Sequence, residues 1–171
     1  QQGAAQRVRN QVARLMPIRK PTPYLLAKGI GVHDGILTDH EGKDTYIPAF
    51  DADGNQWTMQ YIAQDGAKRF AKGARKTGCF HPVGGMKALE QAPVIVVAEG
   101  YATAATLSEA LGQTVVVAFD SGNLLSVARA LHQKYPDRPV VIAGDDDRHL
   151  ELTQGINPGR VKAEAAAAAV G

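Results

Sequence analysis

Three short apolar runs constrain the second half of this chain more than any other feature. They span residues 94–98, 114–119 and 139–143, and segments rich in Ala and Leu at 101–111 and 124–134 separate them. Continuous apolar runs are typical of strands buried on both faces of a parallel sheet. Strands that alternate with helices over these lengths predict a doubly wound α/β unit.

Acidic residues follow each predicted strand: Glu99-Gly100, then Asp120, then Asp145 to Asp147. Ligands of such sheets bind at the carboxyl ends of the strands. Residues two apart in an extended chain face the same side, so Asp145 and Asp147 can point at one cation. Clustered carboxylates repel unless a divalent ion neutralises them, and oxygen ligands favour magnesium or manganese. The sequence therefore predicts a metal-dependent catalytic centre of Glu99, Asp145 and Asp147. Gly100 adds a point where the backbone can approach a phosphate.

A basic strip, residues 68–87, precedes this acidic region. The net charge of the chain is only +2, but the strip contains no acid and six cations: Lys68, Arg69, Lys72, Arg75, Lys76 and Lys87. We interpret the first five as contacts to nucleic-acid or nucleotide phosphate. The alternative is a solvated surface.

The first 90 residues show a different pattern of apolar and polar residues. Residues 4–16 predict an amphipathic helix that stops near Pro17, and residues 1–20 are interpreted as a helical linker or lid. A helical turn capped by Gly29 follows. Two β-rich runs, 46–50 and 56–62, flank Asp53-Gly54 and predict an antiparallel hairpin. We thus expect a small α+β subdomain at 21–90 and an α/β domain at 91–171, whose last predicted helix spans 161–170.

Several residues allow two readings. Asp120-Ser121-Gly122-Asn123 is either a helix-cap turn, with Ser121 or Asn123 as the cap, or part of the site. Trp57 and Tyr61 either stack on bases or pack across the hairpin.

Cys79 is the single cysteine, so no internal disulfide forms, and with His81 it leaves a zinc site two ligands short.

Residues 94–100, followed by helix, strand, helix, strand and the acids at 145–147, resemble a Toprim domain. This is the metal-binding module of primases, type IA and type II topoisomerases and some nucleases. The preceding half, with Pro23-Tyr24-Leu25, the hairpin and 65–70, resembles the N-terminal subdomain of bacterial-type primases. The closest likeness is to the Toprim primases of conjugative plasmids, integrated elements and phages.

This resemblance implies a DNA primase core, a nucleotidyltransferase that makes short RNA primers for DNA replication. Its implied substrates are single-stranded DNA and ribonucleoside triphosphates, and its implied cofactor is Mg2+ or Mn2+. Asp145 and Asp147 would be metal ligands and Glu99 the acid beside the metals or the general acid/base. Lys68, together with Arg69 and Lys72, would contact template or nucleotide phosphate.

Two rival functions stay open: a Toprim nuclease or strand-cleaving enzyme, and a non-catalytic nucleic-acid-binding module. The chain begins at Gln1, and we expect it to be a piece of a longer polypeptide that holds a helicase or a zinc-binding module. We expect a cytoplasmic protein, because no apolar stretch is long enough for a membrane helix and neither a signal sequence nor a disulfide is predicted.

Overall fold

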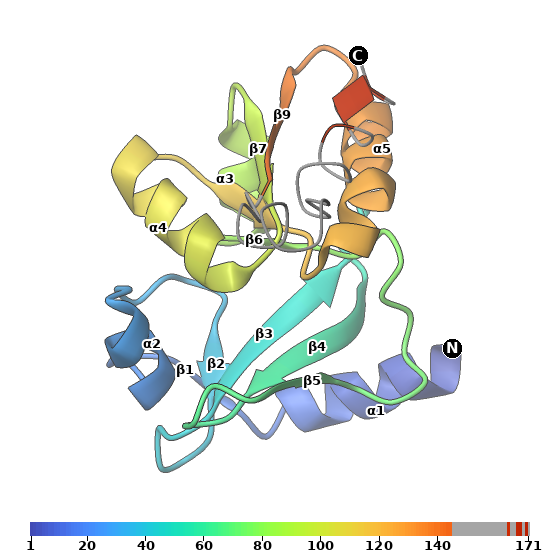
Figure 1. The fold of residues 1–171 in the computed structure, drawn as a ribbon. Coiled ribbons are helices and arrows are strands. Elements are labelled where there is room, and N and C mark those ends of the chain that lie inside the picture. The colour runs from blue at the N-terminus through green and yellow to red at the C-terminus, as the bar shows by residue number, and fades with distance from the viewer. Residues whose placement is uncertain (145–163, 165–166, 169, 171) are drawn as a thin grey trace, which may run out of the picture.

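The computed structural model describes residues 1–144 together with 164, 167, 168 and 170. It contains two sheets that lie one above the other in Figure 1. The lower sheet is antiparallel and its five strands follow in chain order: β1 (Met16–Pro17), β2 (Leu37–Thr38), β3 (Thr45–Phe50), β4 (Gln56–Ile62) and β5 (Lys68–Phe70). The predicted hairpin is confirmed as β3 and β4, with Gly54 at a φ of 84° in the connecting turn.

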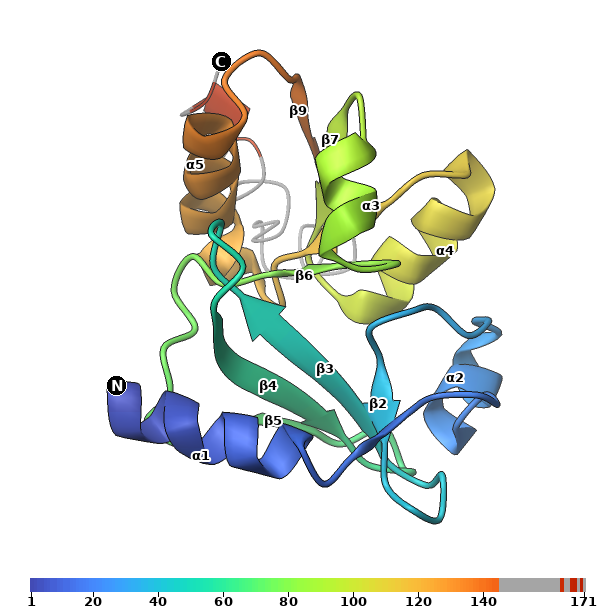
Figure 2. The same ribbon diagram turned by 180° about the vertical axis from the view of Figure 1, so that it is seen from behind.

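Two helices accompany the antiparallel sheet. Helix α1 (Gln2–Val12) packs on β4 and buries Ala4, Ala5 and Val8. It ends before the predicted stop, because i−3 hydrogen bonds tighten the chain after Val12 and Pro17 belongs to β1. Residues 1–20, interpreted above as a linker or lid, thus comprise a helix and a strand that both contact the sheet (Figure 2).

Helix α2 (Pro23–Lys28) ends at the predicted Gly29 cap and has in addition an N-terminal cap that was not predicted. Thr22 caps its first turn by accepting the Leu25 amide, and Pro23 occupies the first turn, where no intrahelical donor is lost. Gly29 closes the helix at a φ of 65°, a left-handed conformation that favours glycine.

The upper sheet has four strands in the order β6 (His81–Pro82), β8 (Val115–Val117), β7 (Ile95–Ala98) and β9 (Val140–Ala143). Strands β7, β8 and β9 run parallel, whereas β6 pairs antiparallel with β8. Helices α3 (Met86–Gln91), α4 (Tyr101–Leu111) and α5 (Leu124–Lys134) surround it, and a short 3-10 turn, η1 (Ser121–Asn123), precedes α5. The predicted α/β fold is confirmed.

The parallel sheet buries a different helix on each face. Val96 and Ala98 of β7 share a core cluster with Ala104 and Ala105 of α4. Ile95 and Val97 point to the other face and share a cluster with residues of α5 and α3, among them Leu124, Val127, Leu131 and Leu89. This alternation is what a two-sided strand requires. The third run differs from expectation, because β9 lies at the edge and Val141 is 48% exposed.

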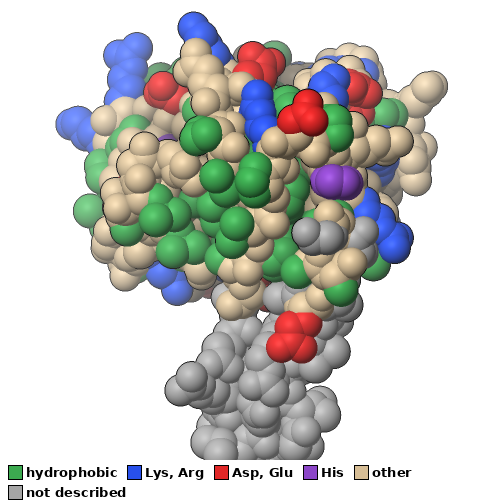
Figure 3. All heavy atoms as spheres, turned by 90° about the horizontal axis from the view of Figure 1, so that it is seen from above, with side chains coloured by type: hydrophobic (Ala, Val, Ile, Leu, Met, Phe, Trp, Pro, Cys, Tyr) green, Lys and Arg blue, Asp and Glu red, His purple; other side chains and the backbone are tan. Residues whose placement is uncertain are grey.

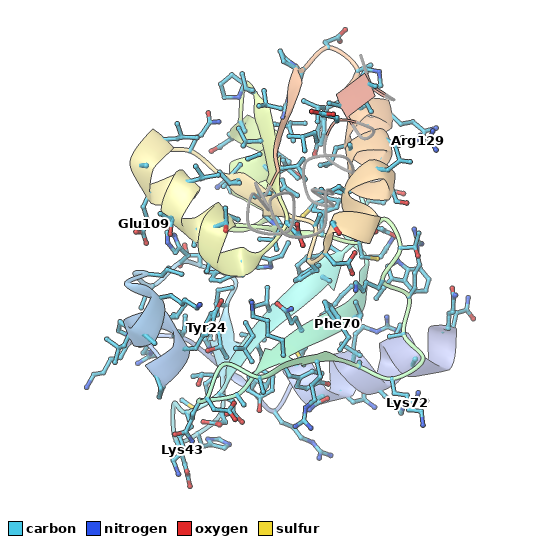
Figure 4. The ribbon with its side chains drawn as sticks, viewed as in Figure 1. Tyr24, Lys43, Phe70, Lys72, Glu109 and Arg129 are labelled. Atoms are coloured by element: carbon cyan, nitrogen blue, oxygen red, sulfur yellow. The ribbon has the colours of Figure 1, made fainter. Side chains whose placement is uncertain are left out.

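The α4-side cluster also joins the two sheets, since it includes Ile47 and Ile62 of the antiparallel sheet. The backbones of Phe50 and Phe80 exchange two hydrogen bonds of 2.8 and 2.9 Å, which connect the end of β3 to the start of β6. Glu109 on α4 accepts the Gly31 amide at 2.9 Å and thereby ties the segment after α2 to the upper layer (Figure 4).

Of the predicted helix 161–170, residues 164, 167, 168 and 170 are described and are helical; the others lie outside the described residues. None of the described helices is long and apolar enough to cross a membrane.

Candidate nucleic-acid and metal site

The carboxyl ends of the three parallel strands meet at one edge of the upper sheet. Ala98 of β7 pairs with both Val117 of β8 and Ala143 of β9, so the chain leaves all three strands at the same level. Figure 1 shows that this edge points down toward the antiparallel sheet. We call it the carboxyl edge. Glu99 and Gly100 lie there, half-buried, whereas Asp145 and Asp147 lie outside the described residues.

Gly100 opens the N-terminus of α4. Among the described residues, no atom lies within 4 Å of a Cβ placed on Gly100, and no side chain caps the helix. The first amides of this eleven-residue helix follow Glu99 and Gly100 directly in the chain. Such amides, at the positive end of the helix dipole, suit an anion such as phosphate.

The candidate metal ligands among the described residues of the carboxyl edge are carboxylate oxygens. Glu99 follows β7 and Asp120 follows β8, and within residues 1–144 no three His, Cys, Asp or Glu side chains form a metal-binding group. Cys79 and His81 are buried in the core, where burial raises the pKa of the thiol to about 11 and lowers that of the imidazole to about 4. Carboxylate donors fit magnesium or manganese better than zinc.

Lys76 brings the basic strip to the carboxyl edge. Its ammonium group forms an ion pair with the Asp120 carboxylate and lies 4.6 Å from the centre of the Phe70 ring. Phe70, the last residue of β5, meets Phe119 edge to face with ring centres 5.2 Å apart. Lys76 and Asp120 line a cavity of about 200 Å³ together with Thr77, Gly122 and Asn123. A cation of the strip and the acid that follows β8 thus lie side by side at this edge.

Phe119 holds an unusual backbone conformation between β8 and Asp120. Its φ is 77°, and it is the only described residue other than glycine with a positive value. A left-handed conformation costs a side-chain-bearing residue roughly 1–2 kcal/mol. Here it turns the chain so that the ring contacts Phe70 and the next carboxylate reaches Lys76. Retained strain of this kind is characteristic of functional sites.

The other predicted phosphate contacts spread along the strip. Lys68 lies 5.8 Å from the Tyr24 ring centre, and Arg75 lies 5.1 Å from that of Trp57. Arg69 is exposed on β5 opposite Tyr61. Lys72 lies beside α1, whereas Phe70 lies between the two layers (Figure 4). The structure thus brings Lys76, but not Lys72, to the carboxyl edge.

Lys72 borders a separate cavity of about 560 Å³ between α1 and the strip. Arg7, Gln11 and Tyr61 also line it, and no acidic side chain does. The opposite end of the molecule differs, because Figure 3 shows positive and negative side chains interspersed there around an apolar area.

The hairpin aromatics make protein contacts. Trp57 donates its indole N–H to Asp51 at 2.8 Å, and Tyr61 donates its hydroxyl to Gln11 at 2.6 Å while its ring meets Tyr46 edge to face. These contacts favour the packing interpretation over base stacking.

Sequence reasoning missed the part that Asn123 plays. Asn123 was one of two candidate caps for α5, with a site role as the alternative, and its side chain makes no cap hydrogen bond. Asp120 instead caps η1 by accepting the Asn123 amide at 2.9 Å. The Asn123 side chain reaches back to residues 76–79 of the strip. The sequence offered one signal, an Asn that follows a strand-terminal Asp by three positions. It does not reveal the partners of this Asn in the strip, which lie 44 to 47 positions earlier.

Comparison with known proteins relates the second half of the chain to a family. Residues 94–171 match the family model described as the Toprim domain. The expected resemblance of this segment to a Toprim domain is thereby confirmed. Over all 171 residues the chain is 67% identical to a protein named DNA primase TraC from Escherichia coli, and over 170 residues it is 66% identical to a second of the same name. The chain spans only 12% and 16% of the lengths of these two relatives.

Solved structures share the fold at low identity. A chain in the structure of the bacteriophage T7 lagging-strand DNA polymerase with the primase domains of two gp4 subunits, an RNA/DNA hybrid and dTTP matches with a TM-score of 0.56 and 16% identity, covering 86% of this chain and 68% of that one. The primase fragment of the T7 primase-helicase protein matches with a TM-score of 0.54 and 17% identity, covering 87% of this chain and 56% of that one. This chain therefore shares its fold with these two structures.

Proposed function

We propose that this chain is the catalytic core of a DNA primase that joins ribonucleotides into short RNA primers on single-stranded DNA. The observation that carries the proposal is the Lys76–Asp120 ion pair, which sets the basic strip against the carboxyl edge of the Toprim sheet next to the Glu99 position. The 67% identity to a DNA primase TraC supports it. A site of this kind would offer cations for phosphates and carboxylates for a metal at one edge of the sheet.

In the proposed reaction the 3′-hydroxyl oxygen attacks the α-phosphorus of a ribonucleoside triphosphate. A new P–O bond forms, pyrophosphate leaves and the hydroxyl proton is lost. We assign Glu99, Asp145 and Asp147 to hold Mg2+ or Mn2+, although the two aspartates lie outside the described residues. The bound ion would neutralise charge on the attacking and leaving oxygens.

The described residues would position the substrates. Lys76 and the first amides of α4 after Gly100 would contact nucleotide phosphates at the carboxyl edge. Lys68, Arg69, Lys72 and Arg75 would bind template or nucleotide phosphate along the strip. Catalysis of this kind depends mainly on positioning and fixed charge, so loss of one carboxylate should affect the rate far more than folding.

The relatives are several times longer than this chain, so we further propose that the core works in the cytoplasm as part of a larger polypeptide. A zinc-binding module or a helicase in that polypeptide would assist initiation or loading on DNA.

Primer synthesis on single-stranded DNA tests the proposal. Labelled ribonucleotides, Mg2+ or Mn2+ and varied templates would be incubated with wild type, Glu99→Gln and Asp145→Asn, each as this fragment and within a longer chain. We expect RNA products from wild type and none from either variant.

The same assay separates the rivals. Metal-dependent shortening of the template without ribonucleotide incorporation would instead indicate a nuclease. Absence of any turnover, with the variants binding DNA as well as wild type does, would indicate a binding module.

A further inference from the structure

The Asn123 side chain connects two segments that both contribute to the carboxyl edge. Asn123 lies at the start of α5 and is only 5% exposed. Its Oδ1 accepts the Gly78 amide at 2.8 Å. Its Nδ2 lies 2.9 Å from the carbonyl oxygens of Cys79 and Ala118 and 3.3 Å from that of Lys76. One buried amide thus joins the basic strip to the end of β8.

The chemistry of the amide fits this orientation alone. Nδ2 faces three carbonyl oxygens and Oδ1 faces an N–H group, so exchanging the two would oppose like groups at every contact. Nδ2 carries two hydrogens, which serve the two 2.9 Å contacts, and the longer contact to Lys76 shares one of them. Neither Asp nor Ala can reproduce the set.

These bonds fix both members of the ion pair at the carboxyl edge. On one side, the Lys76 carbonyl also accepts the Cys79 amide at 2.9 Å, so the 76–79 turn is closed on itself and held to Asn123. On the other side, the backbone amide of Asn123 donates to Asp120 Oδ1 at 2.9 Å, while Asp120 Oδ2 pairs with Lys76. Asn123 therefore holds the backbone of the lysine and the carboxylate of the aspartate.

We infer that Asn123 is a positioning residue that holds Lys76 at the carboxyl edge, where its ammonium group meets the phosphates of the incoming nucleoside triphosphate. This inference rests on the proposed function. Lys76 is on a turn, and a long lysine side chain on a mobile turn would lose conformational entropy each time it contacted a phosphate. An anchored turn reduces that cost, as a supporting shell does for any preorganised site.

Steady-state kinetics of primer synthesis test the inference first. Asn123→Ala should raise the KM for ribonucleoside triphosphate about 10-fold, the value of one charge-assisted hydrogen bond, with kcat changed less than about 3-fold. Thr114→Val is the matched control: Thr114 is buried at the opposite end of β8 and donates one hydrogen bond of 2.7 Å to the Val83 carbonyl. It should lose stability but keep the wild-type KM.

A double-mutant cycle shows whether Asn123 acts through Lys76. Once Lys76→Ala has removed the ammonium group, adding Asn123→Ala should raise the KM by less than about 2-fold, because the two residues serve one contact. If Asn123→Ala raises the KM by the same factor in wild type and in Lys76→Ala, the inference is overturned. A KM shift in Thr114→Val as large as that in Asn123→Ala would also overturn it, since both would then reflect loosened packing.

Hydrogen exchange gives a reading that needs no activity. In folded Asn123→Ala the amides of residues 78 and 79 should exchange faster, while those of β7 keep wild-type rates; unchanged rates at 78 and 79 would overturn the anchoring. Wild type that makes no primers would remove the proposed function and this inference together. If wild type makes primers but the effects of Asn123→Ala and Lys76→Ala on the KM are additive, the inference about Asn123 is wrong and the proposed function stands.

Discussion

At the residue scale, the Lys76–Asp120 pair is informative because it should contribute little to stability. The side chains of Lys76 and Asp120 are 34% and 42% exposed. Ion pairs with such exposure contribute about 0–1 kcal/mol to the free energy of unfolding. We therefore propose that the pair serves substrate binding rather than folding. Phe119, with its strained backbone beside the same pair, supports that interpretation.

Replacing Lys76 tests this directly. Lys76→Met keeps an apolar stem against Phe70 but removes the charge. We expect the free energy of unfolding in urea to change by less than about 1 kcal/mol and the KM for ribonucleotide to rise. A loss of more than about 2 kcal/mol with an unchanged KM would assign the pair to folding instead.

His81 predicts a pH dependence of stability. Burial, opposed by the Pro48 carbonyl and assisted by His33, lowers its pKa from 6.5 to about 4. Between these values the unfolded chain binds more protons, so stability falls as pH drops from about 6.5 to about 4, by up to about 3 kcal/mol. The free energy of unfolding, measured by urea titration at a series of pH values, should depend on pH differently in wild type and His81→Gln only between about pH 4 and 6.5. An identical pH dependence in the two proteins would contradict the assignment.

The positions of individual residues in the fold could be predicted from sequence only where the signal is local. Glu99 and Gly100 follow a recognisable strand and were found at its carboxyl end. Asn123 could not be assigned, because its partners lie more than forty positions earlier and only the folded chain brings them together. The positive φ of Phe119 likewise has no sequence signal, since aromatic residues rarely adopt it.

At the element scale, periodic segments were predicted well and very short ones were missed. Helices α4 and α5 begin and end at the predicted residues, because their apolar composition continues over three turns. Strands β5 and β6 contain three and two residues, too few to show alternation, so neither was expected. Helix α3 was missed for the same reason and is held partly by Arg138, which donates to the Leu89 carbonyl at 2.9 Å.

The cavity between α1 and the basic strip predicts a salt effect on DNA binding. If Lys72 and Arg7 each contact a backbone phosphate, each alanine replacement should lower the slope of log affinity for single-stranded DNA against log salt by about 0.7. Lys43→Ala is the control, because Lys43 pairs with Glu41 at the far turn of the lower layer (Figure 4). Slopes equal to that of the control would show that DNA does not use this cavity.

At the scale of the whole molecule, the two layers share one core. The α4-side cluster includes residues of both sheets, and β6, from the first 90 residues, completes the upper sheet. The boundary predicted at residue 90 therefore separates two segments that bury each other's apolar surface. Sequence analysis could not foresee this, because no local pattern reports which distant face a strand will cover.

Fragments divided at that boundary test the shared core. We expect residues 1–90 and 91–171 each to lack a cooperative thermal transition alone and to regain one when mixed, because each leaves apolar surface uncovered. Near-ultraviolet circular dichroism would follow the transitions. A cooperative transition of 91–171 by itself would show an independent Toprim domain and contradict this expectation.

The most direct test of the central claim is the rate of template-dependent joining of two ribonucleotides, compared between Glu99→Gln and Glu90→Gln. Glu90 is exposed on α3 and provides the same chemical change away from the carboxyl edge. We predict a fall of about 100-fold or more for Glu99→Gln, with both variants folded and binding DNA as wild type does. Equal rates in the two variants would show that the carboxyl edge of this sheet is not the catalytic centre.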